Sequence, residues 1–351
     1  MNRDQVLDPS FTNDQAADES AWQSWDHPDS NWNKSVLQNP PIDPFCARTE
    51  WQLSFHEAME PERNLIVRET PGSMLALAEY NWPDHGLVYG PLENHWFFGS
   101  PLIGPDAIEL LEELSWELIE PFGTPHPSYI ISGLAPDSPV LKQLALKLNS
   151  RFDFLKARSE ILCSASLEGG IDGFLSRRSA KHRRNIGKQH RKATREGVTF
   201  ERQAPTDSIQ AALVYARMIA VEEASWKGIG DCGMATDTSS RYYDCMIQRL
   251  ARYGGARVMF ARHGDEDIGF IFGGLVDSVY RGQQFSYAED WRPYSIGNLL
   301  QLEQIKWLCD ENAERYDMGP MMEYKEHWTE IRRTITAVML RPRSPTRITV
   351  D

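Results

Sequence analysis

The sequence lacks the long apolar runs that a membrane-spanning protein needs. None of its stretches approaches the ~18 consecutive apolar residues of a transmembrane helix. The first residues, MNRDQVLDPSFTNDQ, also lack the basic and apolar segments of a secretory signal peptide. Because 41% of the 351 residues are hydrophobic and 11% are aromatic, the chain can still bury a full core. We therefore expect a soluble cytoplasmic protein with two domains of ordinary size or one large one.

Cysteine and histidine are too scattered to indicate a disulfide framework or a metal site. The five cysteines are odd in number and contain no CxxC, which is typical of free thiols in a reducing compartment. The nine histidines form no HExxH or other ligand cluster. We therefore expect no metal.

Basic residues are scarce overall, because 37 Lys and Arg face 50 Asp and Glu, for a formal net charge of −13. Residues 174–197 reverse this balance with nine basic residues and one acid. The spacing predicts one amphipathic helix that ends at Gly197, with Ile186 on its packing side. A cationic stripe follows its other side: Arg177, Lys181, Arg184, Lys188, Arg191 and Arg195. The stripe indicates an anionic partner, such as a phosphorylated cofactor, an acidic substrate or nucleic acid, or else a plain solvated surface.

Composition divides the chain into three parts. Residues 1–44 form an acidic arm with Trp22, Trp25 and Trp32, which we expect to be partly disordered or docked. Residues 45–165 predict a first α/β unit, with a hairpin turn at residues 71–72. Residues 166–345 predict a second unit, with an antiparallel meander over residues 257–287 and an apolar helix over residues 299–312.

The junction at residues 294–298 precedes that apolar helix. Ser295 suits an N-cap, and Gly297 would let a ligand approach the backbone closely. The free N–H groups and the positive helix end would then face an anion such as a pyrophosphate. The junction matches neither a Walker A loop nor a GxGxxG fingerprint, and plain capping explains its residues equally well.

Two further clusters place a lysine beside an aromatic residue. Lys227 follows Trp226 in EEASWKG, and Lys325 follows Tyr324 in EYKEHW. Neither lysine belongs in a core, although an isolated Trp or Tyr more often does. Asp317, at a predicted strand end, is either a general base or a turn cap.

In this order, these segments resemble the CelD/BcsL-type acetyltransferases of the GNAT superfamily. These enzymes are relatives of the Fem-type peptidoglycan aminoacyltransferases, which consist of two GNAT-like halves. The resemblance covers residues 171–328 and rests on the basic helix, SWKG, the meander, the 294–300 loop, YDMG, and Tyr324-Lys325 with Trp328. One departure is Ile296, where the family pattern has proline between Ser and Gly. In the first half only the element order and HWFFGSPLIGP match.

The resemblance implies an α/β (α+β) fold of two tandem GNAT-like units, each a mixed, mostly antiparallel sheet flanked by helices. It implies an acyl-CoA-dependent N-acyltransferase that transfers an acetyl group to an amine of a small molecule or saccharide precursor. Acetyl-CoA or another acyl-CoA would be the donor, without a metal. The residues implied for donor binding are Ser295, Ile296, Gly297, Asn298 and Leu299. Those implied for catalysis are Glu222 or Asp317 as base and Tyr287 or Tyr324 as acid. Those implied for substrate binding are Lys181, Arg184, Lys188, Trp226, Lys227, Lys325 and Trp328.

Two other functions remain open at this point. A Fem-like transferase would take an aminoacyl group from tRNA, with the basic helix along the acceptor stem and Trp226 or Trp328 stacked on a base. The charge of −13 argues against a large nucleic-acid footprint. A non-catalytic GNAT-fold binding module would use its Trp-rich arm to engage a partner. The sequence is also compatible with a homodimer.

Overall fold

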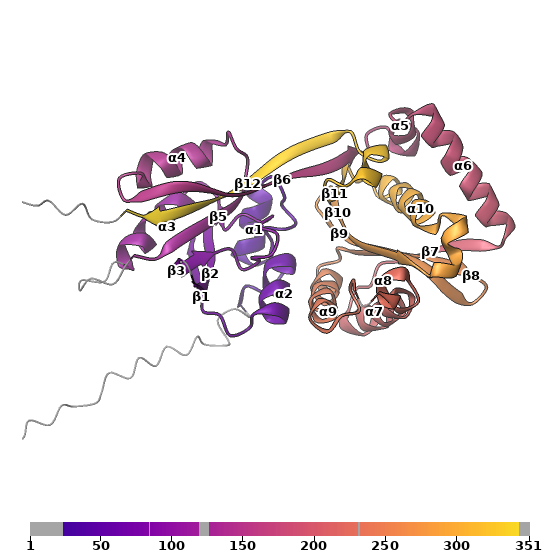
Figure 1. Ribbon diagram of the computed structural model, residues 1–351, viewed down its shortest axis with the longest axis horizontal. Helices are drawn as coiled ribbons and strands as arrows, with labels where there is room; N and C mark the ends of the chain where they lie inside the picture. Colours follow the sequence, from indigo (N-terminus) through magenta and orange to yellow (C-terminus); the bar gives the residue numbers. More distant parts are fainter. Residues whose placement is uncertain (1–23, 84, 119–125, 231, 344–351) are drawn as a thin grey trace, which may run out of the picture.

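The computed structural model describes residues 24–83, 85–118, 126–230 and 232–343 (Figure 1). The described strands form one 12-stranded mixed sheet that continues through both halves of the chain. Its order is β1-β2-β3-β5-β12-β6-β11-β10-β9-β8-β7, and β4 pairs with β2. Within these ranges, no helix combines the length and the apolar character that crossing a membrane requires.

The first half places helices on both faces of its part of the sheet. Helices α1 and α2 cover one face, and α3 and α4 cover the other. The hairpin predicted at residues 71–72 is confirmed, and Gly72 takes a φ of +77° in its turn. The elements are α1 (Asn31–Gln38), α2 (Thr49–Met59), β1 (Leu65–Thr70), β2 (Ser73–Trp82), β3 (Gly86–Gly90), β4 (Leu102–Ile103), α3 (Ala107–Glu117), β5 (Ser128–Leu134) and α4 (Pro139–Leu148).

The described part of the N-terminal arm packs against this half. Trp32 of α1 is only 2% exposed, and its indole N–H donates to the carbonyl of Ala47. Trp25 packs against the same hydrophobic cluster. Trp22 lies outside the described residues.

Two long strands join the halves (Figure 1). β6 (Phe152–Ser166) pairs with β12 (Ile331–Pro342) along its length, and β12 also pairs with β5 of the first half. The sequence did not predict β6, because its middle residues are charged and partly exposed where the strand leaves one core and enters the next. The predicted boundary at residues 165–166 falls at the end of β6, but the sheet itself does not divide there.

In the second half, α5, α6 and α10 lie on one face of the sheet, and α7 and α9 lie on the other. Strands β8, β9 and β10 form the antiparallel meander that the sequence predicted. The elements are α5 (Gly170–Ser176), α6 (Ala180–Arg195), β7 (Val198–Gln203), α7 (Ser208–Glu223), α8 (Trp226–Ile229), α9 (Asp237–Arg252), β8 (Ala256–His263), β9 (Glu266–Val276), β10 (Val279–Tyr287), η2 (Glu289–Tyr294), α10 (Ile296–Asp310), β11 (Arg315–Pro320) and η3 (Glu323–His327).

The prediction of one continuous basic helix over residues 174–197 is wrong. The chain breaks between α5 and α6, where Ser179 caps α6 through its side chain. Arg178 turns inward at the break and forms an ion pair with Glu330 beside β12. Arg177 also pairs with Glu330, so it leaves the cationic stripe. A partly buried ion pair to a distant segment therefore accompanies the break between the two helices.

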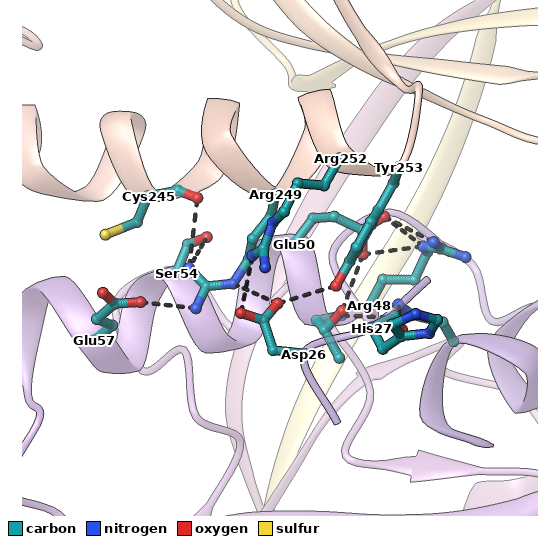
Figure 2. A network of polar contacts seen from close by, with 12 residues as sticks. Asp26, His27, Arg48, Glu50, Ser54, Glu57, Cys245, Arg249, Arg252 and Tyr253 are labelled. Atoms are coloured by element: carbon teal, nitrogen blue, oxygen red, sulfur yellow. Dashed lines mark hydrogen bonds and ion pairs between the residues drawn. The ribbon is translucent and has the colours of Figure 1, made fainter. Parts of the chain in front are cut away.

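A polar network fastens the arm and α2 to α9 (Figure 2). Arg249 is nearly buried, and its guanidinium pairs with Asp26 at 3.0 Å and with Glu57 at 2.7 Å. It also donates to the Ser54 hydroxyl, while the Tyr253 hydroxyl donates to Asp26. Breaking such a buried network by removing one partner is strongly destabilising. The two halves are therefore joined by side-chain ion pairs and hydrogen bonds as well as by the shared sheet.

Candidate active site

Strands β10 and β11 run side by side for only three residue pairs. Residues 279–281 of β10 pair in parallel with residues 315–317 of β11. Beyond these pairs, β10 shifts its register against β9 between Gly282 and Gln284, and β11 shifts against β6 between Asp317 and Pro320. Because a bulge bends its strand, the two strands diverge. A pocket of about 380 Å³ lies where they part.

The pocket receives side chains from α8, β9, β10, α10, β11 and η3. Its described lining residues are Trp226, Lys227, Ile271, Gly282, Gln283, Gln284, Phe285, Gln301, Tyr316, Met318, Met322, Tyr324 and Lys325. The wall is therefore largely apolar, with lysine, glutamine and tyrosine as its polar groups.

Lys227 enters the pocket from the short helix α8. Ser225 caps that helix by accepting from the backbone N–H groups of Lys227 and Gly228. The Lys227 ammonium donates to the Phe285 carbonyl at 2.8 Å and to Gln284 Oε1 at 3.2 Å. Burial lowers the pKa of Lys227. Trp226, beside it, is 56% exposed and forms the rim.

Lys325 enters from η3 on the opposite side. Its Nζ donates to the carbonyls of Met318 and Pro320, each at 2.7 Å. Burial, reinforced by the charge of Arg281, lowers the pKa of Lys325 to about 8. The neighbouring Tyr324 packs edge-on against Phe285, and burial raises its pKa to about 12.

A buried ionic cluster holds the point from which the strands diverge. Arg281 lies between Asp43 at 3.2 Å and Asp317 at 3.5 Å. Burial raises the pKa of Asp317, against the opposing effect of Arg281. Gly319 takes a φ of +73°, and a Cβ there would collide with the Arg281 guanidinium. The N-terminal segment that carries Asp43 thus contacts Arg281, which directly precedes Gly282 of the pocket lining.

Comparison with known families identifies this region. Residues 180–326 match the family model described as acetyltransferase (GNAT) domain. The match covers less than half of the chain but includes all the described residues that line the pocket. A comparison with curated proteins found no match.

Solved structures resemble the chain over nearly its whole length. FemX is 11% identical, with a TM-score of 0.61 over 88% of this chain and 95% of that one. A conserved protein of unknown function from Bacteroides thetaiotaomicron VPI-5482 is 10% identical, with a TM-score of 0.59 over 89% and 97%. L-PGS from Bacillus licheniformis is 13% identical, with a TM-score of 0.56 over 90% and 92%. These identities support the fold alone, and the predicted two-unit α/β fold is confirmed.

The GNAT domain brings four of the predicted site residues together at the pocket: Trp226, Lys227, Tyr324 and Lys325. The two predicted bases lie close by but outside its lining. Asp317 is 6% exposed and accepts from the Gly319 N–H at 2.8 Å. Glu222 is fully buried, accepts from the Met234 N–H at 3.0 Å, and lies 3.9 Å from the Lys227 ammonium. Both carboxylates are therefore held by protein partners.

The predicted donor loop lies next to the pocket rather than in it. A Cβ on Gly297 would come within 3.0 Å of the Phe285 ring and 3.3 Å of the Tyr287 ring. Phe285 therefore separates the pocket from the N-terminus of α10, and Tyr287 packs on the loop side. Asn298 is exposed, whereas Ile296 and Leu299 are buried.

Ser295 is the N-cap residue of α10, as the sequence predicted, but its side chain does not cap the helix. Ser295 has a φ of +57°, and its side chain makes no capping hydrogen bond. A side-chain N-cap ordinarily needs extended backbone. Ser295 also ends η2, and the tight connection between the two helices imposes the left-handed conformation.

The remaining predicted residues lie away from the pocket. Lys181, Arg184 and Lys188 are exposed on α6. Trp328 is 2% exposed, stacks on Phe174 and meets His182 edge-on. Its position beneath α5 and α6 makes it a core residue of this half.

Sequence reasoning missed the glutamines of the pocket. Gln283 and Gln284 come from the bulge of β10, and Gln301 comes from the inner face of α10, which also carries buried Gln304. A glutamine in a buried helical stripe was the available signal, since buried polar groups need partners. Within the described part of the chain, no group of His, Cys, Asp and Glu could hold a metal ion.

Proposed function

We propose that the protein is an acyl-CoA-dependent N-acyltransferase whose reaction takes place between β10 and β11. The observation that carries this proposal is the parting of the two parallel strands around a pocket within a GNAT domain. Beyond Arg281, the edge of β10 that faces β11 has no strand partner there. Backbone N–H groups on such an edge can polarise a thioester carbonyl and stabilise the charge that develops on its oxygen.

In this proposal the N-terminus of α10 holds the pyrophosphate of the donor. Helix N-termini favour anions through their free N–H groups and their dipole. Lys192 of α6 adds positive charge nearby, because it donates to the Pro293 carbonyl at 2.9 Å and lies over the Tyr294 ring. The Phe285 ring lies next to Gly297 and also lines the pocket, so the helix end and the pocket are neighbours.

Lys325 is our candidate for the proton acceptor. A neutral lysine amine has two N–H groups and one lone pair, and the carbonyls of Met318 and Pro320 take both N–H groups. The lone pair is then left to accept a proton. A pKa of about 8 keeps a usable fraction of the amine neutral at physiological pH.

Acyl-CoA, when bound, supplies the acyl group as a thioester. The amine of the acceptor forms the new C–N bond and the C–S bond breaks. Lys325 takes the proton that the amine loses, and the Tyr324 hydroxyl gives a proton to the departing thiolate. Glu222 and Asp317 act through the lysines, since Glu222 lies beside Lys227 and the charge of Asp317 raises the pKa of Lys325.

One observation favours a second class of donor, aminoacyl-tRNA. In the part of the chain that the structure describes, Lys181, Arg184, Lys188, Arg191 and Arg195 make no ion pair. These five residues form the cationic stripe of α6. An aminoacyl-tRNA donor would use such a surface.

Calorimetry with acetyl-CoA, longer acyl-CoAs and aminoacyl-tRNA tests the donor. Asn298→Asp adds a negative charge to the first turn of α10, where it favours the helix but repels a pyrophosphate. We expect the wild type to bind acetyl-CoA, Asn298→Asp to bind it about tenfold or more weakly, and Asn298→Ala to resemble the wild type. Undiminished binding by Asn298→Asp, or binding of aminoacyl-tRNA alone, would contradict the proposal.

A further inference from the structure

Hydrogen-bond donors exceed acceptors among the charged and amide side chains of the pocket. Two lysines and three glutamines line it, and none of its described lining residues is Asp or Glu. Lysine offers only donors, whereas a carboxylate offers only acceptors. The two lysines are therefore the charged groups among the described lining residues, and Glu222, outside the lining, lies 3.9 Å from the Lys227 ammonium.

Gln301 is a buried donor in the wall of the pocket. This residue of α10 is 4% exposed and lines the pocket beside Tyr316. Its Nε2 is buried and makes no hydrogen bond of full geometry among the described residues, and an interaction with the Tyr316 side chain offsets part of the rise that burial causes in the pKa of Tyr316. The Nε2 of Gln283, on the bulge of β10, is also buried and makes no hydrogen bond among the described residues. A ligand that supplies oxygen atoms to the pocket would give these two donors the partners that buried polar groups normally have.

Lys227 supplies the charge for such a ligand. Two of the three N–H groups of its ammonium reach Gln284 Oε1 and the Phe285 carbonyl. The third is left for a partner. Glu222, at 3.9 Å, lies beyond hydrogen-bond distance and does not line the pocket. A charged acceptor in the pocket would therefore gain a charge-assisted hydrogen bond without displacing a protein group.

We infer that the acceptor substrate is a small amine that also carries a carboxylate, which Lys227 binds while Gln301 donates to an oxygen of the same molecule. The identity of the amine as nucleophile rests on the proposed function. No arginine lines the described pocket, and much of the remaining wall is apolar, including Ile271, Met318 and Met322. The single ammonium of Lys227 matches the one charge of a carboxylate better than the roughly two charges of a phosphate group, and the apolar wall suits a carbon skeleton.

The test measures binding to the full chain without any acyl donor. Free amino acids and dipeptides are compared with the same compounds as C-terminal carboxamides, by thermal shift and then by calorimetry. We expect the acids to raise the melting temperature more than the carboxamides. For the best acid, Gln301→Leu and Lys227→Gln should each weaken affinity at least about tenfold, and Lys227→Arg should retain part of it.

Gln304→Leu is the matched control for Gln301→Leu. Gln304 lies one turn further along α10, is fully buried with both amide atoms unbonded, and does not line the pocket. Its replacement should leave the affinity for the acid unchanged. An equal loss in Gln304→Leu would show that α10 had repacked, and Lys227→Gln alone would then decide the outcome.

Equal binding of acids and carboxamides, or no acid that binds, would overturn the inference. If acids and carboxamides bind equally but the protein binds acetyl-CoA and transfers its acyl group, the proposed function is still supported. Conversely, acids that bind through Lys227 and Gln301 in a protein that binds no acyl-CoA would contradict the proposed function alone.

Discussion

The chemistry of individual residues in this pocket depends on how each is held. Lys325 is buried, and its nitrogen donates to two carbonyls rather than to a carboxylate. Because no carboxylate hydrogen-bonds to it, burial and the charge of Arg281 dominate and lower its pKa to about 8. A lysine in solution, with a pKa near 10.5, would be almost entirely protonated at neutral pH.

This pKa predicts the pH dependence of acyl transfer. The neutral form of Lys325 is the active base, and its fraction grows as the pH rises through about 8. The value of kcat/KM should therefore rise about tenfold per pH unit below 8 and level off above it. Lys325→Arg keeps the charge but cannot lose its proton, so we expect a loss of about 10²–10⁴-fold.

Asp317→Asn provides the matched control for this profile. The charge of Asp317 raises the pKa of Lys325, so its removal should move the midpoint of the profile to lower pH. A wild-type rate independent of pH between 6 and 9 would exclude Lys325 as the base.

The residue scale also separates what the sequence could and could not predict about the site. A lysine beside an aromatic residue was visible twice, and both Lys227 and Lys325 reach the pocket. Trp328 belongs to the same motif by sequence but is covered by α5 and α6. Its exposure was decided by helices more than a hundred residues earlier in the chain, which no local pattern reveals.

At the scale of single elements, α6 has the strongest charge pattern. Ile186 and Ala193 face the core, as the spacing predicted, while the cationic stripe faces solvent. Like charges at i,i+4 destabilise a helix, so the stripe lowers the stability of α6. Its position outside the pocket means that it cannot bind the reacting groups directly.

Replacing Lys181, Arg184 and Lys188 by Glu should therefore affect binding of an anionic donor without affecting the acyl-transfer step. We expect weaker binding of anionic donors, by about tenfold at low salt, and little change in the maximal rate at saturating donor. Helix content, measured by circular dichroism, should not fall. Binding to acetyl-CoA and to tRNA is measured as a function of added salt.

A reversal of Lys34, Arg68 and Lys147 on the first half changes the net charge by the same amount and serves as the control. If both triple variants lose affinity equally, only the overall charge matters. If neither does, α6 is a solvated surface helix.

At the scale of the whole molecule, the sheet makes the halves interdependent. β12 comes from the end of the chain, yet it lies between β5 and β6 and completes the sheet of the first half (Figure 1). Its residues Ala337, Val338 and Met339 belong to the cores of that half. Arg249 and its partners connect the same halves through side chains (Figure 2).

Residues 1–165 and 166–351, expressed separately, should consequently fail to fold. The first piece would lack β12, and the second would expose both edges of β12, which pair with β5 and β6 in the full chain. We expect the full chain to unfold in one cooperative transition by calorimetry, and neither piece to show one alone. A cooperative transition in either isolated piece would show that the predicted boundary separates autonomous domains.

By itself, the sequence determined the local elements and the class of fold. Hydrophobic periodicity and turn residues specify the 71–72 hairpin, the β8–β10 meander and α10, because these depend on neighbours along the chain. Only the tertiary structure decided the rest. It broke the basic helix beside the Arg178–Glu330 ion pair, carried charged β6 between two cores, and brought Gln301 to the pocket with Lys227 and Lys325. Each of these outcomes depends on contacts between residues far apart in the chain. Such contacts decide which side chains are buried, and burial in turn changes their pKa values and hydrogen-bond partners.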